Sequence, residues 1–404
     1  MALGQNTSMV LRICKADMTT YNGFIWPTKG YVEAPDWDDT EECGHGLHGW
    51  FEAQGDASYS SYLNEPGAKY LVLEVETDSI IHLDGKCKFP EADVVFVGSR
   101  NEAIAYIEET YPYLQTMPLL FANRTVGDSG VVTTGDYGTA IAGNYGTAKA
   151  GRYGTAKAGY NGTAKAGFRG TATAGKYGTA TAGTYGTATA DFRGTATVGD
   201  FGTATAGFRG TATVGDFGTA TAGFRGAATA GDFGIAIAGN YGTVKVGYYG
   251  TAKAGYNGTA TAGKYGTATA GTYGTATADF RGTATVGDFG TATAGFRGTA
   301  TAGDRGTATV GEYGTATAGK HGTATVGDYG TATVGDCGTA IAGDFGIAIA
   351  GIRGTVKVGS SGIIQIHYFT DRDRIAIGYI GEKGLKPNVK YKLDANHNFV
   401  EDVS

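Results

Sequence analysis

The sequence predicts a mainly β protein: a two-sheeted β-solenoid with 16 residues per coil, preceded by a small α+β head and followed by a C-terminal β cap. Three observations support this prediction. An eight-residue unit repeats in constant register over residues 123–370, residues 1–122 do not contain it, and it is lost again over residues 371–404. Self-similarity at a fixed short period is typical of stacked repeat architectures. We therefore expect a head domain, a solenoid and a capping segment with these boundaries.

The repeat consists of 31 octets, and its alternation predicts one strand per octet. In octets counted from Asn123, the second and fourth positions are Ala, Val or Ile almost throughout, whereas the third takes Thr, Lys, Ile or Gln. Such alternation is typical of a strand with one buried face. The interior is mostly alanine, so the two inner faces must approach closely. The Gly-x-x-Gly element that ends each octet is expected to be the corner, because glycine tolerates the positive φ that tight corners need.

Two octets are expected to form one coil, since four residues of strand and four of corner complete only half a circuit. The corner pairs agree with this: from Asp191 to Phe233 they alternate between Phe-Arg and Asp-Phe, which places one kind of pair on each edge. The corner aromatics should then stack as ladders along the edges. About 15 coils at roughly 4.8 Å each predict a rod of about 70 Å.

The flanking segments carry ordinary strand and helix signals. In the head, "KYLVLEVE" and "DVVFVG" predict strands, and "SRNEAIAYIEETY" predicts a helix whose Ser99 and Glu102 form a capping box. The C-terminal segment predicts two or three strands with a turn at "LDANHNF". We expect it to cap the solenoid, because an open sheet edge would template aggregation.

Charge and composition limit the partners. The net charge of -6 combines an acidic head, -12 over residues 1–122, with a mildly basic body, +6 over residues 123–370. An acidic head makes nucleic-acid binding unexpected. The first ten residues lack the features of a signal peptide, and no apolar run approaches the length of a membrane helix. We therefore expect a cytoplasmic protein with reduced cysteines, without a membrane partner and without a cofactor.

The segment "ECGHGLHGW" is the sharpest local signal in the head. Cys43, His45 and His48 are candidate zinc ligands, with Cys14 or Cys87 as a distant fourth, because zinc accepts thiolate and imidazole in tetrahedral sites. The spacing is not that of a standard zinc finger, and the three glycines of the segment favour a tight backbone turn with packed histidines. We predict the turn and no metal site.

The chain resembles an uncharacterised family found in bacteria and phages, in which a CGxGLHG-type domain precedes a GTATAG octapeptide-repeat β-solenoid. The resemblance rests on "DMTTYNGFIWP", "CGHGLHGW", the octet array and the ending "GYIGEKGLKPNVKYKLDANHNFVE". It covers nearly the whole chain and implies the architecture, but it implies no activity.

A second resemblance concerns the head alone. "GHGLHGWFEAQGDASYSSYL" followed by "AKYLVLEVE" is similar to half of an ADP-ribosyltransferase fold. It implies that Tyr59 or Tyr62 stacks on nicotinamide and that Glu74 or Glu76 polarises a ribose hydroxyl. The upstream His-Gly or Arg motif of that fold is missing, and Arg12 is the only arginine before Arg100. No other catalytic residue is predicted.

The outward threonines are the candidate site of the body. Seventeen octets carry Thr at both outward positions, and the regular Thr-x-Thr ladder resembles the ice-binding faces of β-solenoid antifreeze and ice-nucleation proteins. The alternative is that threonine is simply a good β-forming polar residue. The candidate ladder residues are Thr171, Thr173, Thr179, Thr181, Thr203, Thr205, Thr259, Thr261, Thr267, Thr269, Thr291 and Thr293.

Lysines interrupt the threonine ladder in two patches. They either keep an edge-rich body soluble or receive an acidic partner such as the head of another copy. The residues are Lys149, Lys157, Lys165, Lys245 and Lys253.

Three functions remain open from the sequence. The preferred one is a non-catalytic scaffold: a rigid solenoid that presents the head and assembles into a homo-oligomer or filament through its ends or faces. The first alternative is a protein that binds ice or another regular surface through the Thr-x-Thr ladders. The second is an ADP-ribosyltransferase-like head on a solenoid spacer.

Overall fold

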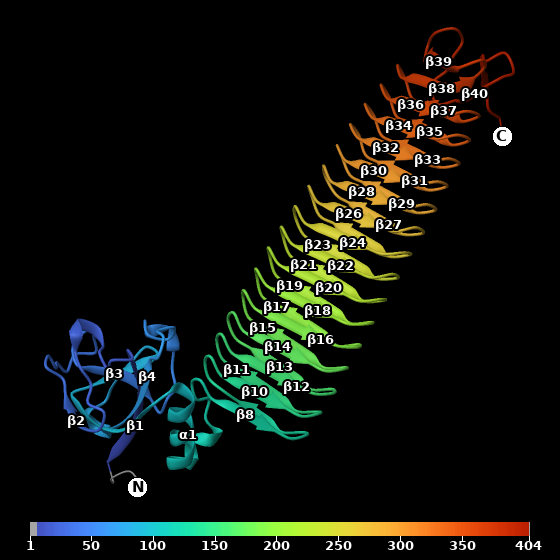
Figure 1. Cartoon of the computed structure of the whole chain (residues 1–404). Coiled ribbons are helices and arrows are strands. Elements are labelled where there is room, and N and C mark those ends of the chain that lie inside the picture. Colours follow the sequence, from blue (N-terminus) through green and yellow to red (C-terminus); the bar gives the residue numbers. More distant parts are fainter. Residues whose placement is uncertain (1–5, 404) are drawn as a thin grey trace. The chain divides into compact units, whose positions relative to one another are not determined.

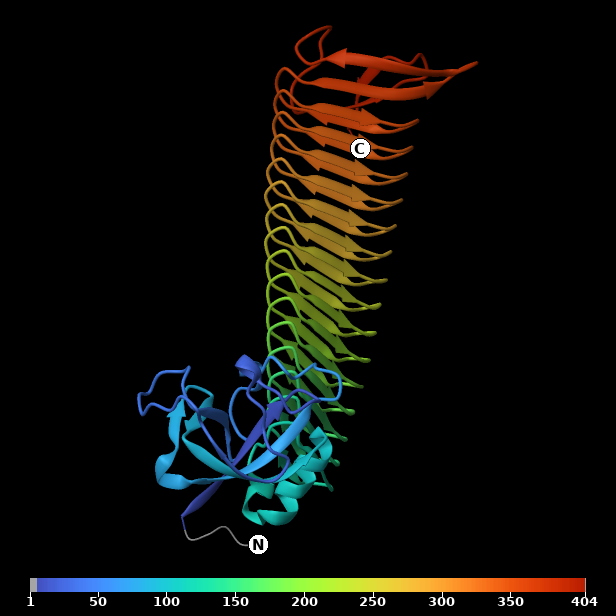
Figure 2. The same ribbon diagram turned by 60° about the vertical axis from the view of Figure 1, so that its left-hand side comes forward.

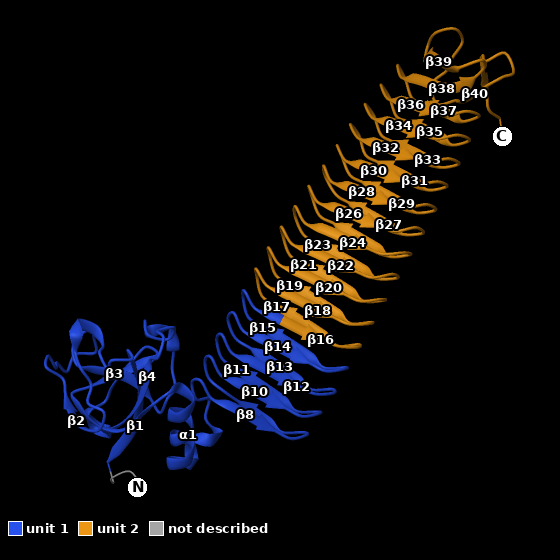
Figure 3. Cartoon of the chain, viewed as in Figure 1, with its two compact units in different colours: residues 1–187 blue, residues 188–404 orange. Residues whose placement is uncertain are grey.

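A computed structural model describes residues 6–403. The chain divides into two compact units, residues 1–187 and 188–404 (Figure 3). The division falls inside the repeat, so each unit contains a stretch of the solenoid. The domain boundaries after residues 122 and 370 remain predictions.

The head is built on one seven-stranded sheet, with strand order β2-β7-β4-β1-β3-β6-β5. Neighbouring strands pair antiparallel. The stretch predicted as a strand from "KYLVLEVE" is β4, and "DVVFVG" lies in β7. The strands are β1 (Thr7–Cys14), β2 (Gly30–Glu33), β3 (Leu47–Phe51), β4 (Lys69–Glu76), β5 (Ile81–Leu83), β6 (Lys86–Phe89) and β7 (Glu91–Gly98).

The predicted helix of the head is α1 (Arg100–Thr110), and its capping box is present. The Ser99 backbone N–H donates to the Glu102 carboxylate at 2.8 Å, and the Glu102 N–H donates to the Ser99 hydroxyl at 3.4 Å. Within residues 6–403, four short 3-10 turns complete the helical content: η1 (Tyr21–Gly23), η2 (Ala57–Tyr59), η3 (Thr77–Ser79) and η4 (Pro112–Thr116). None of the described helices is both long and apolar enough to cross a membrane.

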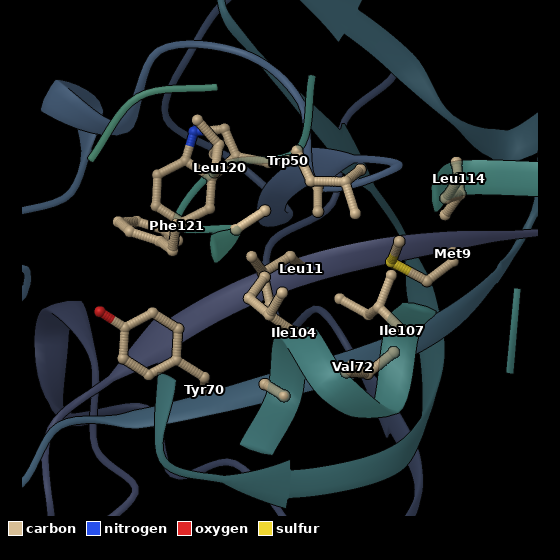
Figure 4. Packing of buried hydrophobic residues seen from close by; sticks show 14 of the residues in the cluster. Met9, Leu11, Trp50, Tyr70, Val72, Ile104, Ile107, Leu114, Leu120 and Phe121 are labelled. Carbon is tan, nitrogen blue, oxygen red and sulfur yellow. The ribbon is translucent and has the colours of Figure 1, made fainter. Parts of the chain in front are cut away.

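Both faces of the head sheet are buried. On one face, Met9 and Leu11 of β1 pack with Ile104 and Ile107 of α1 and with Phe121 (Figure 4). The other face carries a second cluster, whose members include Val10, Leu71, Leu73, Trp26 and Phe89. Large side chains thus fill the head on both sides of a single sheet.

The repeat forms one four-residue strand per octet. From β10 (Thr139–Ala142) to β37 (Thr355–Val358), every strand is four residues long and begins eight residues after the one before it; β8 (Asn123–Val126) and β9 (Val131–Thr133) precede them. Even-numbered strands pair with even-numbered ones and odd with odd, always parallel and with partners 16 residues apart, in unit 1 as in unit 2. This confirms the predicted two-sheeted solenoid of 16-residue coils (Figure 1).

The predicted burial pattern is also confirmed. From β10 to β37, the second and fourth residues of the octets point inward; Ala292 and Ala294 are 0% and 3% exposed. The outward positions carry the threonines. Over these strands the inner layer consists of alanine with occasional valine, as the alternation predicts.

The explanation offered for the corner glycines is wrong. Positive φ occurs at the seventh octet position, which is not glycine: Tyr177 has φ 60° and Arg209 has φ 56°. The glycines are needed for space. A Cβ on Gly178 would lie 2.8 Å from both the Ala174 Cβ and the Gly162 carbonyl oxygen, closer than any side chain tolerates. Close contacts with the neighbouring coil and with the alanine of the same octet, not backbone conformation, therefore require glycine there.

The aromatic ladders along the two edges are confirmed. In unit 2, Phe208 and Phe224 stack on one edge with ring centroids 5.3 Å apart, and Phe217 and Phe233 stack on the other at 5.0 Å. The repeated turns that carry them line the edges in Figure 2. Corner carboxylates add a second ladder: the Asp232 backbone N–H donates to the Asp216 carboxylate of the preceding coil at 2.8 Å.

Antiparallel strands close both sheets at the C-terminal end. The even-numbered sheet ends with β38 (Ile363–Phe369) and β39 (Asp373–Tyr379), and the odd-numbered sheet ends with β40 (Lys390–Leu393) and β41 (Phe399–Glu401). The predicted turn at "LDANHNF" joins β40 to β41, where the Asp394 N–H donates to the Asn398 carbonyl at 3.0 Å.

Within unit 1, the first coils continue the head core. Leu119, Leu120 and Phe121 belong to the same cluster as the α1 side chains, and Tyr137 of the first complete coil packs against it. Arg124 of β8 donates to the Glu108 carboxylate of α1 at 2.7 Å. The head and the first coils therefore share one core.

Candidate functional site

The outward threonines form two uninterrupted arrays in unit 2. On the even-numbered sheet, five successive strands, β26 to β34, carry Thr at both outward positions; on the odd-numbered sheet, the five strands β25 to β33 do the same. We name them the even array and the odd array. The even array comprises Thr267, Thr269, Thr283, Thr285, Thr299, Thr301, Thr315, Thr317, Thr331 and Thr333; the odd array comprises Thr259, Thr261, Thr275, Thr277, Thr291, Thr293, Thr307, Thr309, Thr323 and Thr325.

Strand pairing holds these threonines in register. Thr267 pairs with Thr283 and Thr269 with Thr285, and the same correspondence repeats up each sheet. Neighbouring strands lie about 4.8 Å apart and alternate residues of one strand about 7 Å apart. Each array is therefore two columns of five threonines with the spacing of a parallel sheet.

The first-position threonines are the more exposed column. Thr299 and Thr315 are exposed, whereas the third-position residues of the same strands, Thr301 and Thr317, are half-buried between their neighbours. Threonine has a branched Cβ that restricts χ1, so both columns present methyl and hydroxyl groups from stiff side chains.

Other residue types bound both arrays. On the even-numbered sheet, β24 carries Lys253 before the array, and β36 carries Ile347 and Ile349 after it. On the odd-numbered sheet, β23 carries Lys245 before the array and β35 carries Ile341 after it. Of the two lysine patches found in the sequence, Lys245 and Lys253 thus lie at the start of the arrays and outside them, whereas the other patch lies on β11 to β13 of unit 1.

The candidate threonines of the sequence fall in three places. Thr171, Thr173, Thr179 and Thr181 lie on β14 and β15 of unit 1. Thr203 and Thr205 lie on β18 of unit 2, and the remaining six belong to the two arrays. The sequence list omitted the other array members. A period of 16 assigns alternate octets to the two sheets, and sorting the threonines by this period identifies the remaining array members.

Cys43, His45 and His48 each have separate surroundings. The Lys86 ammonium donates to the Cys43 Sγ at 2.8 Å, and the His45 Nδ1 lies 3.6 Å from an Asp36 carboxylate oxygen. His48 of β3 is half-buried. Among residues 6–403, no group of three His, Cys, Asp or Glu side chains is placed to hold a metal ion.

The candidate transferase residues are divided between two places. Tyr59 and Tyr62 line a cavity of about 560 Å³ in the head. Glu74 of β4 is not in that lining; it accepts a hydrogen bond from the Tyr111 hydroxyl at 3.0 Å, and burial beside Glu74 raises the pKa of Tyr111. Glu76 is exposed at the end of β4. A catalytic role for these four residues remains a prediction.

Comparison with known proteins gives one family match and several relatives. Residues 8–105 match the family described as "Domain of unknown function (DUF7666)". The chain is 38% identical over 103 residues to an ice nucleation protein of Pseudomonas fluorescens, which covers 25% of this chain and 8% of that protein. It is 35% identical over 106 residues to one of Xanthomonas campestris pv. translucens, covering 26% and 7%, and 34% identical over 101 residues to ice nucleation protein InaU of Pantoea ananas, covering 24% and 10%.

These matches identify a DUF7666 domain at the N-terminal side and a repeat β-solenoid similar to ice nucleation proteins. The chain spans at most a tenth of the length of these three relatives. No solved structure matches.

Proposed function

We propose that this protein binds ice through the even and odd arrays. The observation that carries the proposal is the set of ten threonines held in register over five successive coils on each sheet. The similarity to proteins named ice nucleation proteins supports this alternative more strongly than a scaffold without a binding surface. Ice is a periodic surface, so a protein surface that binds it must itself be periodic over several repeats.

The chemistry of the arrays suits an ordered water layer. Backbone pairing fixes the column spacing at about 4.8 Å, and restricted χ1 rotamers fix the hydroxyl positions. Little side-chain freedom is lost on binding, so the ordering cost that usually opposes recognition is small. The methyl groups beside the hydroxyls limit hydrogen bonding to disordered water, which favours a regular arrangement over bulk solvent.

Thermal hysteresis and ice shaping by the purified chain test the proposal, with droplet freezing as a second measurement. Thr283→Lys/Thr299→Lys disrupts the even array and Thr275→Lys/Thr291→Lys the odd array. We expect each variant to reduce the hysteresis and the combination to abolish it, because each variant places a lysine in each of two adjacent coils of its array. Thr184→Lys/Thr272→Lys is the matched control, since both threonines lie in corners. An inactive parent chain, or equal activity in all four variants, would contradict the proposal.

A second proposal concerns self-association, which the sequence analysis predicted. We propose that copies associate through the outer face of β39. Ile375, Ile377 and Tyr379 follow one another at strand spacing and are 48%, 52% and 50% exposed. Contiguous exposed apolar side chains typically mark an interaction surface.

Analytical ultracentrifugation tests the association. Ile375→Lys/Ile377→Lys should shift the chain to monomer. Ile235→Lys/Ile237→Lys is the control, because this pair has the same spacing and similar exposure on β22. A parent chain that is monomeric at all concentrations would refute the association and leave ice binding by single molecules open.

A further inference from the structure

The head contains a cavity that has no part in the ice binding proposed for the two threonine arrays. Its volume is about 560 Å³, within the range of sites for small molecules. Residues of β1, β3 and β6 line it, together with the loop around residues 20–26 and the segment 59–62. All of these residues belong to unit 1.

Arg12 of β1 brings a positive charge without a counterion to this cavity. Its Nη1 donates to the His48 carbonyl at 2.9 Å, and its Nε is buried without a hydrogen-bond partner. Burial lowers the pKa of Arg12; the neighbouring groups that act on it are Tyr62 and Cys14, and no carboxylate of residues 6–403 pairs with it. A buried cation without a counterion is costly, so an anion at this place would be stabilised.

Lys86 of β6 adds a second cation to the lining. Its ammonium lies 2.8 Å from the Cys43 Sγ and 5.3 Å from the ring centroid of Tyr59. Asp36 is the only carboxylate of the lining, and it already accepts the Gly46 N–H at 3.1 Å and faces His45. The lining therefore carries more positive than negative charge.

His48 lies beside the same two cations. Its Nε2 is buried without a hydrogen-bond partner. Burial, Lys86 and Arg12, in that order, lower the pKa of His48 to about 4. The imidazole is neutral at pH 7, so the charged groups of the lining are the two cations, Arg12 and Lys86, and the Asp36 carboxylate.

Aromatic rings form much of the remaining wall. They are supplied by Tyr21, Phe24, Trp26, Trp50, Tyr59 and Tyr62. The Arg12 guanidinium lies 5.8 Å from the Trp26 ring centroid, so the cationic part of the site adjoins the aromatic part. Planar ligands stack on such rings, while guanidinium and ammonium groups take an oxyanion.

We propose that this cavity binds a small planar molecule that carries a carboxylate or phosphate group. The oxyanion lies between Arg12 and Lys86, and the planar part lies against the aromatic wall. The cavity thereby gives the head a binding function separate from the threonine arrays.

Cysteine protection tests the proposal on the full chain. Cys43 lines the cavity and is exposed, Cys337 is exposed in the other unit, and Cys14 and Cys87 are buried with pKa values raised by burial to about 11 and about 12. N-ethylmaleimide labelling, followed by mass spectrometry, therefore compares one cavity thiol with one thiol of the other unit. The probes are adenosine monophosphate and indole-3-acetate, with adenosine and inorganic phosphate as the separate halves of adenosine monophosphate.

We expect at least one of the two ring-bearing anions to slow labelling of Cys43 about tenfold at ten times its dissociation constant, by mass action, and to leave Cys337 unchanged. Adenosine and inorganic phosphate at the same concentration should protect much less. The phosphate and carboxylate probes distinguish the two sources of the oxyanion. Protection by neither ring-bearing anion, or equal protection by inorganic phosphate alone, overturns the proposal.

Charge variants locate the anion. Arg12→Gln and Lys86→Gln should each weaken probe binding about tenfold or more, the range for a lost charge-assisted hydrogen bond. Lys15→Gln is the matched control, because Lys15 is an exposed cation outside the cavity lining. Because Lys86 contacts Cys43, each variant is compared with itself with and without probe. If Arg12→Gln does not fold, the proposal is tested with Lys86→Gln alone. Equal affinity of the Lys86→Gln and Lys15→Gln variants for the probe overturns the proposal.

Discussion

The head and the solenoid stabilise their strands by opposite means. The head covers both faces of one sheet with large side chains, such as Leu11 and Leu71. The solenoid places little more than alanine, such as Ala292, between its two sheets. Stabilisation grows with the apolar area buried, so an alanine layer contributes less per residue, and pairing with the neighbouring coils carries more of it. Removing volume should harm the head, and adding volume should harm the solenoid.

The chain allows the two regions to be followed separately. All three tryptophans, Trp26, Trp37 and Trp50, lie in the head, so tryptophan fluorescence reports the head and the first coils that share its core. Far-UV circular dichroism is dominated by the many strands of the solenoid. The predictions below use this division.

Loss of volume in the head should give the largest effect. Leu71 is fully buried on β4, and Leu71→Ala should reduce the free energy of unfolding of the head by about 2–5 kcal/mol. Urea unfolding followed by tryptophan fluorescence measures it. Ile25→Ala is the control, because Ile25 is 68% exposed and its loss should cost less than about 0.5 kcal/mol. Equal midpoints for the two variants would show that the head core is not packed as described.

Added volume in the solenoid should give the second-largest loss of stability. Ala292 is fully buried on β29, and Ala292→Leu should destabilise the solenoid by about 1–3 kcal/mol because the sheets cannot separate locally. The thermal transition in circular dichroism should fall while the fluorescence transition stays. Thr293→Leu, which points outward from the same strand, is the control. A solenoid that accepts leucine at residue 292 without loss would disprove the close approach of its sheets.

Two corner glycines sharpen the comparison within the repeat. A Cβ on Gly298 would lie 2.7 Å from the Ala294 Cβ and 2.9 Å from the Gly282 carbonyl oxygen, so Gly298→Ala should cost about 1–2 kcal/mol. Gly127 has open space around it and no positive φ, so Gly127→Ala should be neutral or stabilise by about 0.4–1 kcal/mol. Circular dichroism melting measures both. The same sign for both variants would refute the steric explanation of the corner glycines.

The smallest effect concerns pH and the head alone. The pKa of His48 is lowered from its ordinary 6.5 to about 4, so the folded head holds fewer protons there than the unfolded chain. The contribution of His48 to the stability of the head is therefore present above pH 6.5 and is lost as the pH falls towards 4. Because His48 is only half-buried, we expect this contribution to the free energy of unfolding to be about 1 kcal/mol. His48→Gln should remove this dependence of the fluorescence midpoint, and an unchanged slope between pH 6.5 and 4.5 would contradict it.

The sequence predicted the solenoid well because its signal is local and repeated. Alternation defines strand and inward face in every octet, and the corner pairs near Phe208 and Phe217 were enough to assign two octets to a coil. The same locality explains the error at the corners. Gly178 is glycine because of Gly162 in the previous coil as well as Ala174 in its own octet, and the contact between coils is not visible in one octet.

The cavity of the head was beyond sequence reasoning for a related reason. Arg12, His48 and Lys86 lie on three strands and are far apart in the chain, and nothing near Arg12 marks it as a residue without a counterion. The motif around Cys43 and His48 drew attention, through its metal-binding residue types, to a segment that lines the cavity. The lysine and the arginine beside it, on which the proposed anion binding rests, come from other strands.

The equivalence of the two arrays has a genetic consequence. Residues 171–210 and 259–298 are identical and lie 88 residues apart, which is 11 octets, so a duplication has shifted sequence by an odd number of half coils. An odd shift moves every downstream octet to the opposite sheet. Because both sheets carry the same inward alanines and outward threonines, unequal recombination can lengthen or shorten the gene by single octets without spoiling either face, and natural selection is free to tune the length of the array.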